Sequence, residues 1–135
     1  MSSDTSFTAI EAHLRTGFTA APLVFENEPW PEQDTPAAFV VVEVFGDFYA
    51  QESIGAPGQN LWRESGSILM HVMVPNDTGS TSARSLARQL VGLFREVTID
   101  GVHFGEMSIG AGEAGKEQSS YYRMTASVDF WRDDD

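Results

Sequence analysis

The chain has 135 residues, no cysteine, and a formal net charge of −12 from 20 acidic and 8 basic side chains. This length fits a single domain over residues 1–135, and the missing cysteines exclude disulfides, thiol catalysis and thiolate metal sites. The acidic surface repels phosphate, which argues against nucleic-acid binding. No apolar run approaches the roughly 20 residues of a membrane helix, and the first residues lack a signal-peptide pattern. We therefore expect a soluble protein that is made in the cytoplasm.

The spacing of apolar residues predicts the elements of secondary structure in chain order. The first helix carries its apolar side chains every three or four positions. The longest predicted strand is apolar on both faces, which favours a central place in a sheet, with Val40, Val42, Val44 and Phe48 expected on one face. The expected helices are 6–19 and 81–96, and the expected strands are 23–25, 39–49, 67–74, 102–106 and 122–131.

The predicted order is α-β-β-β-α-β-β, and it indicates an α+β fold. Long loops are expected at 26–37, 50–66 and 105–120, where proline, glycine and polar residues gather. Each amphipathic helix needs a face to cover. Packing both helices on one face of a mostly antiparallel sheet is the simplest arrangement that provides it.

One tetrapeptide matches a catalytic signature. Asp77-Thr78-Gly79-Ser80 resembles the turn of aspartic proteases, in which two copies of an Asp-Thr/Ser-Gly sequence bring two carboxylates together to share a proton. In those enzymes the motif follows an apolar strand directly and leads into more β-structure. Here Pro75-Asn76 precedes it and a predicted helix follows. The same residues are good helix N-caps, so we favour a helix start and expect no enzyme, with a dimeric protease using Asp77 as the remote alternative.

Two other patterns are weaker. Gly110 to Gly115 fits the G-x-G-x-x-G dinucleotide fingerprint, but it leads to a strand instead of the helix that would hold the pyrophosphate. His13, His71 and His103 are widely spaced and lack the clustering of metal ligands. We therefore expect no cofactor and no metal site.

Five residues are candidates for contact with a partner. Arg84, Arg88 and Arg95 project from the second predicted helix within about 40° of one another, since a helix advances 100° per residue. They either dock onto an acidic neighbour, such as a second copy of the chain, or form a solvated face. Trp30 and Trp62 lie in predicted loops, where a large aromatic side chain either anchors a partner or folds back onto the core.

In the order, spacing and apolar pattern of its elements, the chain resembles the tail-terminator family of siphophages, the group that caps the tail tube in lambda-like particles. The resemblance covers nearly the whole chain and includes no invariant catalytic residue. The segments that carry it are Ile10 to Arg15, Val24 to Asn27, Ala38 to Val42, Gly66 to Pro75, Gly79, Ala83 to Leu90, Leu93-Phe94 and Tyr122 to Trp131.

The resemblance implies a virion protein at the head-proximal end of the tail. Six copies would form a ring on the last ring of tube protein, stop tube growth and present a surface to head-completion proteins, while DNA passes through the lumen without specific binding. Such a ring needs two different complementary patches on each subunit. The arginines and an acidic loop containing Glu26, Glu28, Glu32 and Asp34 are candidates for the pair. The competing assignment is another head–tail joining or neck protein.

Overall fold

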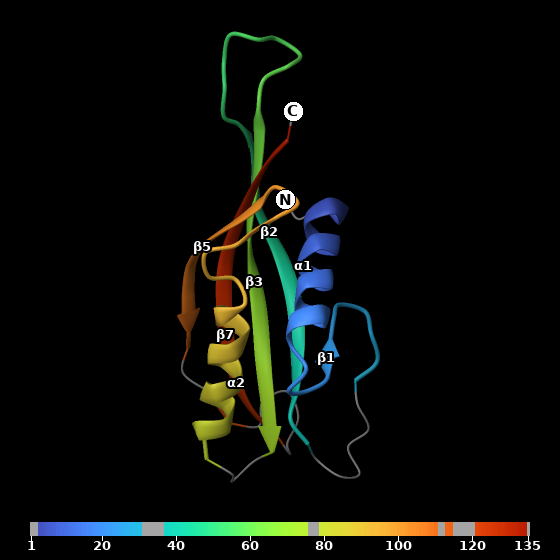
Figure 1. Ribbon diagram of the computed structural model, residues 1–135, viewed down its shortest axis with the longest axis vertical. Coiled ribbons are helices and arrows are strands. Elements are labelled where there is room, and N and C mark those ends of the chain that lie inside the picture. The colour runs from blue at the N-terminus through green and yellow to red at the C-terminus, as the bar shows by residue number, and fades with distance from the viewer. Residues whose placement is uncertain (1–2, 31–36, 76–78, 111–112, 115–120, 135) are drawn as a thin grey trace.

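The computed structural model describes residues 3–30, 37–75, 79–110, 113–114 and 121–134. A twisted sheet runs along the length of the molecule, and both helices lie on the same face of it (Figure 1). The helices are α1 (Asp4–Gly17) and α2 (Thr81–Gly92), and the strands are β1 (Leu23–Val24), β2 (Phe39–Gln51), β3 (Trp62–Pro75), β4 (Thr98–Ile99), β5 (Val102–Ile109), β6 (Glu113–Ala114) and β7 (Tyr121–Asp134).

The sheet is mixed and curls into a half-barrel. Its strand order is β1-β2-β3-β7-β5-β4, with β6 also paired to β7. β1 pairs with β2 in parallel, whereas the other described pairs are antiparallel. The long strands β2, β3 and β7 form the middle of the sheet and carry most of its pairing.

The core lies between the concave face of this sheet and the two helices. Even-numbered side chains of β3 and β7 point into it because successive residues of a strand face opposite sides. Ile10 and Leu14 of α1 and Leu90 of α2 contribute fully buried side chains to the same cluster. The members of the core from the three long strands are Val40, Val42, Val44, Ile68, Met70, Val72, Val74, Met124, Ala126, Val128 and Phe130.

Helix α2 ends earlier than the apolar pattern predicts. Gly92 is its last residue, and the next turn is closed by tighter bonds from the N–H of Phe94 to the carbonyl of Val91 and from the N–H of Arg95 to that of Gly92. Glu96 then adopts a left-handed conformation with φ of 56°. Arg95 therefore lies beyond the helix, in the turn that leads to β4.

The long hairpin of β2 and β3 extends past both helices at one end of the molecule (Figure 1). Residues 45–66 form this projection, which we call the arm. The strands pair as far as Gln51 with Trp62, and β7 lies beside β3 up to Asp134, so the base of the arm is three-stranded. Residues 52–61 make the turn at its tip.

A β-bulge at the base of the arm reverses the faces of β2. Gly46 pairs with Gly66, but Phe48 pairs with Ser65, so Asp47 is an extra residue in β2. Such a bulge shifts every later side chain to the opposite face. Phe48 is therefore 71% exposed, and the prediction that it shares a face with Val44 is wrong.

The predicted fold needs correction in its sheet and loops. Two helices and a largely antiparallel sheet are present in the predicted order α-β-β-β-α-β-β, to which the structure adds the two-residue strands β4 and β6, but the sheet is a mixed half-barrel. The predicted loop 50–66 is mostly the end of β2, a turn and the start of β3. The predicted loop 105–120 contains the second half of β5 and all of β6. In both segments, pairing with a neighbouring strand extends the strands through glycine-rich and polar sequence that has no β period of its own.

Candidate interaction surface

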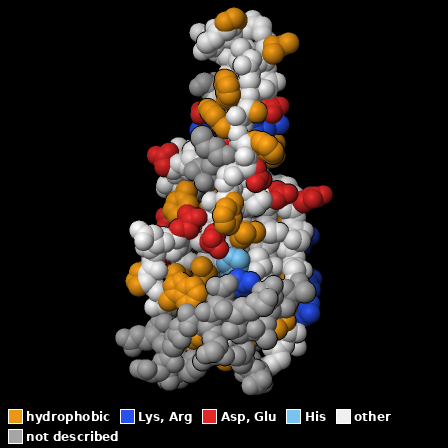
Figure 2. All heavy atoms as spheres, turned by 180° about the vertical axis from the view of Figure 1, so that it is seen from behind, with side chains coloured by type: hydrophobic (Ala, Val, Ile, Leu, Met, Phe, Trp, Pro, Cys, Tyr) orange, Lys and Arg blue, Asp and Glu red, His pale blue; other side chains and the backbone are white. Residues whose placement is uncertain are grey.

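The arm carries most of the large hydrophobic side chains that the described part of the chain leaves exposed. Ile54 at the tip is 91% exposed, and Phe48 is the next most exposed. Figure 2 shows hydrophobic side chains along the projecting hairpin and acidic side chains around its base. Exposed apolar groups gathered on a projecting element are typical of an interaction site. The exposed large hydrophobic residues of the arm are Phe45, Phe48, Tyr49, Ile54, Leu61 and Trp62.

The charges of the arm are unbalanced toward the acidic side. Arg63 is already engaged within the chain, because its guanidinium donates to Asp133 at 2.7 Å and lies over the Trp131 ring at 4.0 Å. The carboxylate of Asp133 raises the pKa of Arg63 further above its ordinary value. Asp47 and Glu52 are exposed and form no ion pair with another described residue. The arm therefore presents aromatic rings together with two exposed carboxylates, of which Glu52 lies near the charge of Arg63 without forming a close ion pair with it.

A buried carboxylate fixes the arm to the body. Glu64 of β3 is 0% exposed, and its Oε1 accepts hydrogen bonds from the N–H of Ser3 at 3.2 Å and from the Ser3 hydroxyl at 3.0 Å. Ser3 is the N-cap of α1, where its hydroxyl accepts from the N–H of Ser6. Oε2 of Glu64 lies 3.5 Å from Nη1 of Arg132, the residue opposite it on β7. This one side chain ties α1, β3 and β7 together where the arm leaves the body.

The ionised form of Glu64 is the favoured one. Burial, the largest influence, opposes ionisation. The polar groups of Ser6 and Ser3 and the charge of Arg132 outweigh burial and hold the pKa of Glu64 below its ordinary value of 4.5.

Two of the three predicted arginines lie together on the outer surface of α2. Arg84 and Arg88 are exposed, and Nε of Arg84 donates to the Ser80 hydroxyl at 3.2 Å. Neither forms an ion pair with any described residue. We call this pair the arginine face. Arg95, also exposed, lies in the turn after the helix.

Two of the four acidic residues predicted at an interface have partners within the chain, and their interface role stays a prediction. Glu28 accepts a hydrogen bond from the Phe25 N–H at 2.9 Å and pairs with Arg15 at 2.9 Å, and these two contacts, the first being the stronger, lower the pKa of Glu28. Glu26 accepts from the N–H of Val44 at 3.1 Å. Both carboxylates thus have partners within the chain. Glu32 and Asp34, the other two candidates of the loop, lie outside the described residues.

The two predicted tryptophans lie far apart in the structure. Trp30 packs edge-on against Phe39, with ring centroids 5.4 Å apart, so it folds back onto the convex face of the sheet. Trp62 is the first residue of β3, not a loop residue, and its ring lies 5.3 Å from that of Tyr49. Both indoles are 38% exposed. Trp62 therefore belongs to the apolar surface of the arm.

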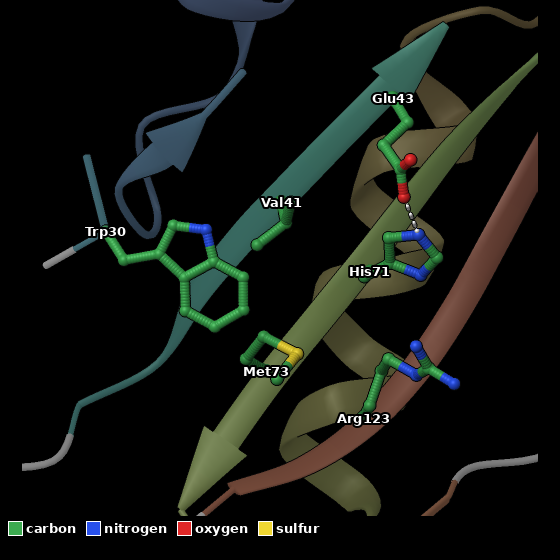
Figure 3. A pocket seen from close by; sticks show the side chains of 6 residues that line it. All are labelled: Trp30, Val41, Glu43, His71, Met73 and Arg123. Atoms are coloured by element: carbon green, nitrogen blue, oxygen red, sulfur yellow. Dashed lines mark hydrogen bonds and ion pairs between the residues drawn. The ribbon is translucent and has the colours of Figure 1, made fainter. Parts of the chain in front are cut away.

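The convex face has a small hollow of about 110 Å³, lined by Trp30, Val41, Glu43, His71, Met73 and Arg123 (Figure 3). In it the His71 ring joins three strands, with Nε2 2.7 Å from Oε1 of Glu43 and Nδ1 2.8 Å from Oγ1 of Thr125. A carboxylate, an imidazole and a hydroxyl in a row are also the parts of a nucleophilic hydrolase. Here all three residues come from the middle of paired strands. The backbone N–H groups beside them are hydrogen-bonded to neighbouring strands, so they cannot stabilise the negative oxygen that forms during such a reaction.

The two catalytic-looking motifs lie partly outside the described residues. Asp77 is not described. Gly79, with φ of 79°, leads within two residues into α2. A helix after the motif is the context that we predicted, and it differs from the β-structure that follows the turn in aspartic proteases. In the glycine-rich segment, Gly110 bonds through its N–H to the carbonyl of Thr125, and the next described residues form β6.

Two further findings concern function. Among the described residues no three His, Asp or Glu side chains are grouped so as to hold a metal ion. None of the described helices is both long and apolar enough to cross a membrane.

Comparison with solved structures places the chain in a known fold. One similar structure is titled only with a sequence identifier, and the alignment covers 100% of this chain and 97% of that protein's chain. The TM-score is 0.70 and the sequence identity is 21%. A chain from the virion of a native gene transfer agent particle is similar over 94% of this chain and 93% of its own, with a TM-score of 0.57 and 13% identity. No family model and no curated protein matches the sequence. At these identities the likeness shows a shared fold.

Proposed function

We propose that this chain is a structural protein of a phage-like virion, and that it caps the tail tube as a ring of six copies. The ring stops growth of the tube, presents its other side to head-completion proteins, and lets DNA pass through an acidic lumen. The observation that carries the proposal is the arm, because a small domain that displays six large hydrophobic residues on one projecting hairpin is built to be covered by another protein.

Two further observations support this role. The fold is shared with a chain of a gene transfer agent virion over more than nine-tenths of both lengths. The net charge of −12 suits a surface past which a DNA duplex slides without binding, because the excess of carboxylates repels the phosphates of the duplex.

Tube length tests the proposal. When the tube protein of the same particle polymerises in the presence of increasing amounts of this chain, we expect tubes whose mean length falls as the ratio of chain to tube protein rises. Electron microscopy of negatively stained tubes measures the length and shows whether one end carries a cap. Bovine serum albumin at the same concentration is the control for crowding. Tubes of unchanged length at a molar excess of the chain contradict the capping role.

Deletion of the gene separates capping from head joining. Loss of a tail terminator leaves overlong tubes, whereas loss of a joining protein leaves tails of normal length beside unattached heads. Normal tails in the deletion strain would assign the chain to the head–tail joint instead.

The Asp77→Asn variant tests the protease alternative. Expressed in the deletion strain, this variant is expected to restore tails of normal length, because the N-cap of α2 is Ser80 and asparagine matches aspartate in size. Particle yield and tail length against the wild-type gene measure the effect. A variant that folds but leaves virion proteins unprocessed would establish a catalytic role for Asp77 and overturn the structural assignment.

A further inference from the structure

We propose that the occupant of the arm is a second copy of the chain, and that the arm of one copy docks on the arginine face of helix α2 in the next. The inference rests on the proposed ring and names the two patches that form it.

The first argument is charge. Asp47 and Glu52 on the arm have no ion-pair partner among the described residues, and neither have Arg84 and Arg88. The chain has 20 acidic and only 8 basic residues. Two exposed arginines on one helix face, with no acidic residue in that helix, therefore form a positive patch on a mostly negative surface. Pairing each set with the other across an interface satisfies both and orients the two subunits.

The second argument is the chemistry of the rings. A guanidinium binds well over an aromatic face, and the described part of the chain contains such contacts, with Arg15 over Phe25 at 4.5 Å and Arg63 over Trp131 at 4.0 Å. The exposed Trp62 on the arm offers such a face to the arginine face of a neighbour. Arginine and large aromatic residues are also the side chains that contribute most to protein interfaces.

The third argument is the presence of apolar surface beside the arginines. Val91 follows Arg88 by three positions, so the two side chains are neighbours on the helix. Val91 is only partly buried against the core, so part of it stays accessible to Ile54 or Leu61 of another arm. The arginine face therefore offers both charge and a small apolar contact.

The fourth argument is position. The tip of the arm and helix α2 lie toward opposite ends of the long axis of the molecule (Figure 1), so one chain cannot bring its own two patches together. Two different patches at opposite ends give head-to-tail contacts, and these close into a ring when the rotation between neighbours closes.

Mixing two defective variants tests this arrangement. The arm variant carries Asp47→Arg, Glu52→Arg and Ile54→Ser, and the helix variant carries Arg84→Glu and Arg88→Glu. Each alone is expected to sediment as a 14.8 kDa monomer. An equimolar mixture is expected to form a one-to-one dimer, because the intact arm of the helix variant meets the intact α2 of the arm variant. Sedimentation equilibrium measures the masses, with the wild-type chain as the reference ring.

Matched controls change charge elsewhere on the same elements of the fold. Glu106→Arg reverses an exposed acid on β5, and Ser82→Glu with Gln89→Glu adds acid to exposed positions of α2 that are not three or four residues from either arginine. Both controls are expected to keep the wild-type mass. A helix variant that still forms wild-type rings, a mixture that stays monomeric, or a wild-type chain that is monomeric at every concentration overturns the inference.

A disulfide provides a second measurement that does not depend on weakened assembly. The chain has no cysteine, so Ile54→Cys and Arg88→Cys supply the only thiols, one on each side of the proposed contact. Under mild oxidation the double variant is expected to give ladders of covalent oligomers on a denaturing gel, while each single variant gives at most dimers. A double variant without oligomers beyond the dimer contradicts the proposed contact. If both charge variants still shorten tubes while these contacts fail, the docking inference falls and the capping role stands.

Discussion

Gly66→Ala is expected to lower the free energy of unfolding by about 3 kcal/mol or more, an effect of the size that overpacking and strain in a core produce. Gly66 lies on β3 opposite Gly46, beside the bulge where the arm leaves the body. A Cβ at this position would collide with the backbone carbonyl of Phe45, and it would also come within 2.9 Å of the Phe130 ring. The ring can turn aside, but the carbonyl belongs to the paired strand and moves only if the hairpin opens.

The control for this prediction is Gly92→Ala. Gly92 ends helix α2, and a Cβ there meets nothing within 4 Å. Alanine is a better helix former than glycine by up to about 1 kcal/mol, so this variant is expected to be as stable as the wild type or slightly more so. Urea denaturation followed by tryptophan fluorescence compares the three proteins. Equal midpoints for Gly66→Ala and the wild type would show that the hairpin adapts without strain.

The elements with a clear local periodicity could be predicted from the sequence. The apolar side chains of α1 and the alternating pattern of β7 depend on local periodicity, and both elements appear close to their predicted positions. Strand β3 was predicted only from Ser67, because Trp62 to Gly66 is polar and glycine-containing. Its early start is set by β7, which runs alongside as far as Asp134. Pairing with a strand that is distant in sequence leaves no local signal in the residues that it orders.

The residues of the candidate interaction surface could be predicted only in part, for a related reason. Arg84 and Arg88 were found because helical spacing puts them on one face, and the helix is present. The exposure of Phe48 was not predicted, because it depends on the bulge at Asp47, which reverses the faces of β2. The sequence Gly46-Asp47 contains no pattern that predicts a bulge. The ion pair of Glu28 with Arg15 was not predicted, because Arg15 comes from a helix that only the tertiary fold brings near.

Glu64→Gln is expected to destabilise the protein at neutral pH by on the order of 1–3 kcal/mol, the range for a hydrogen bond to a buried charged group. The amide keeps an oxygen for the Ser3 N–H and hydroxyl but loses the charge that faces Arg132 at 3.5 Å. Because the contact joins the N-cap of α1 to β3 and β7, its loss loosens the start of the helix and the base of the arm together. Thermal unfolding followed by circular dichroism measures the change.

The same pair of proteins gives a pH test whose sign follows from linkage. The pKa of Glu64 in the folded protein lies below 4.5, so the unfolded state binds a proton first. The stabilisation from the ionised carboxylate is therefore complete above pH 4.5 and is lost as pH falls through the folded pKa. The difference in unfolding free energy between the wild type and Glu64→Gln should be constant from pH 5 to 7 and shrink below about pH 4.5. Asp129→Asn, at an exposed carboxylate of β7, is the control that should leave this acid dependence in place. A difference that grows on acidification would mean that Glu64 is buried in its neutral form, and the account of how α1 is tied to the arm would then be wrong.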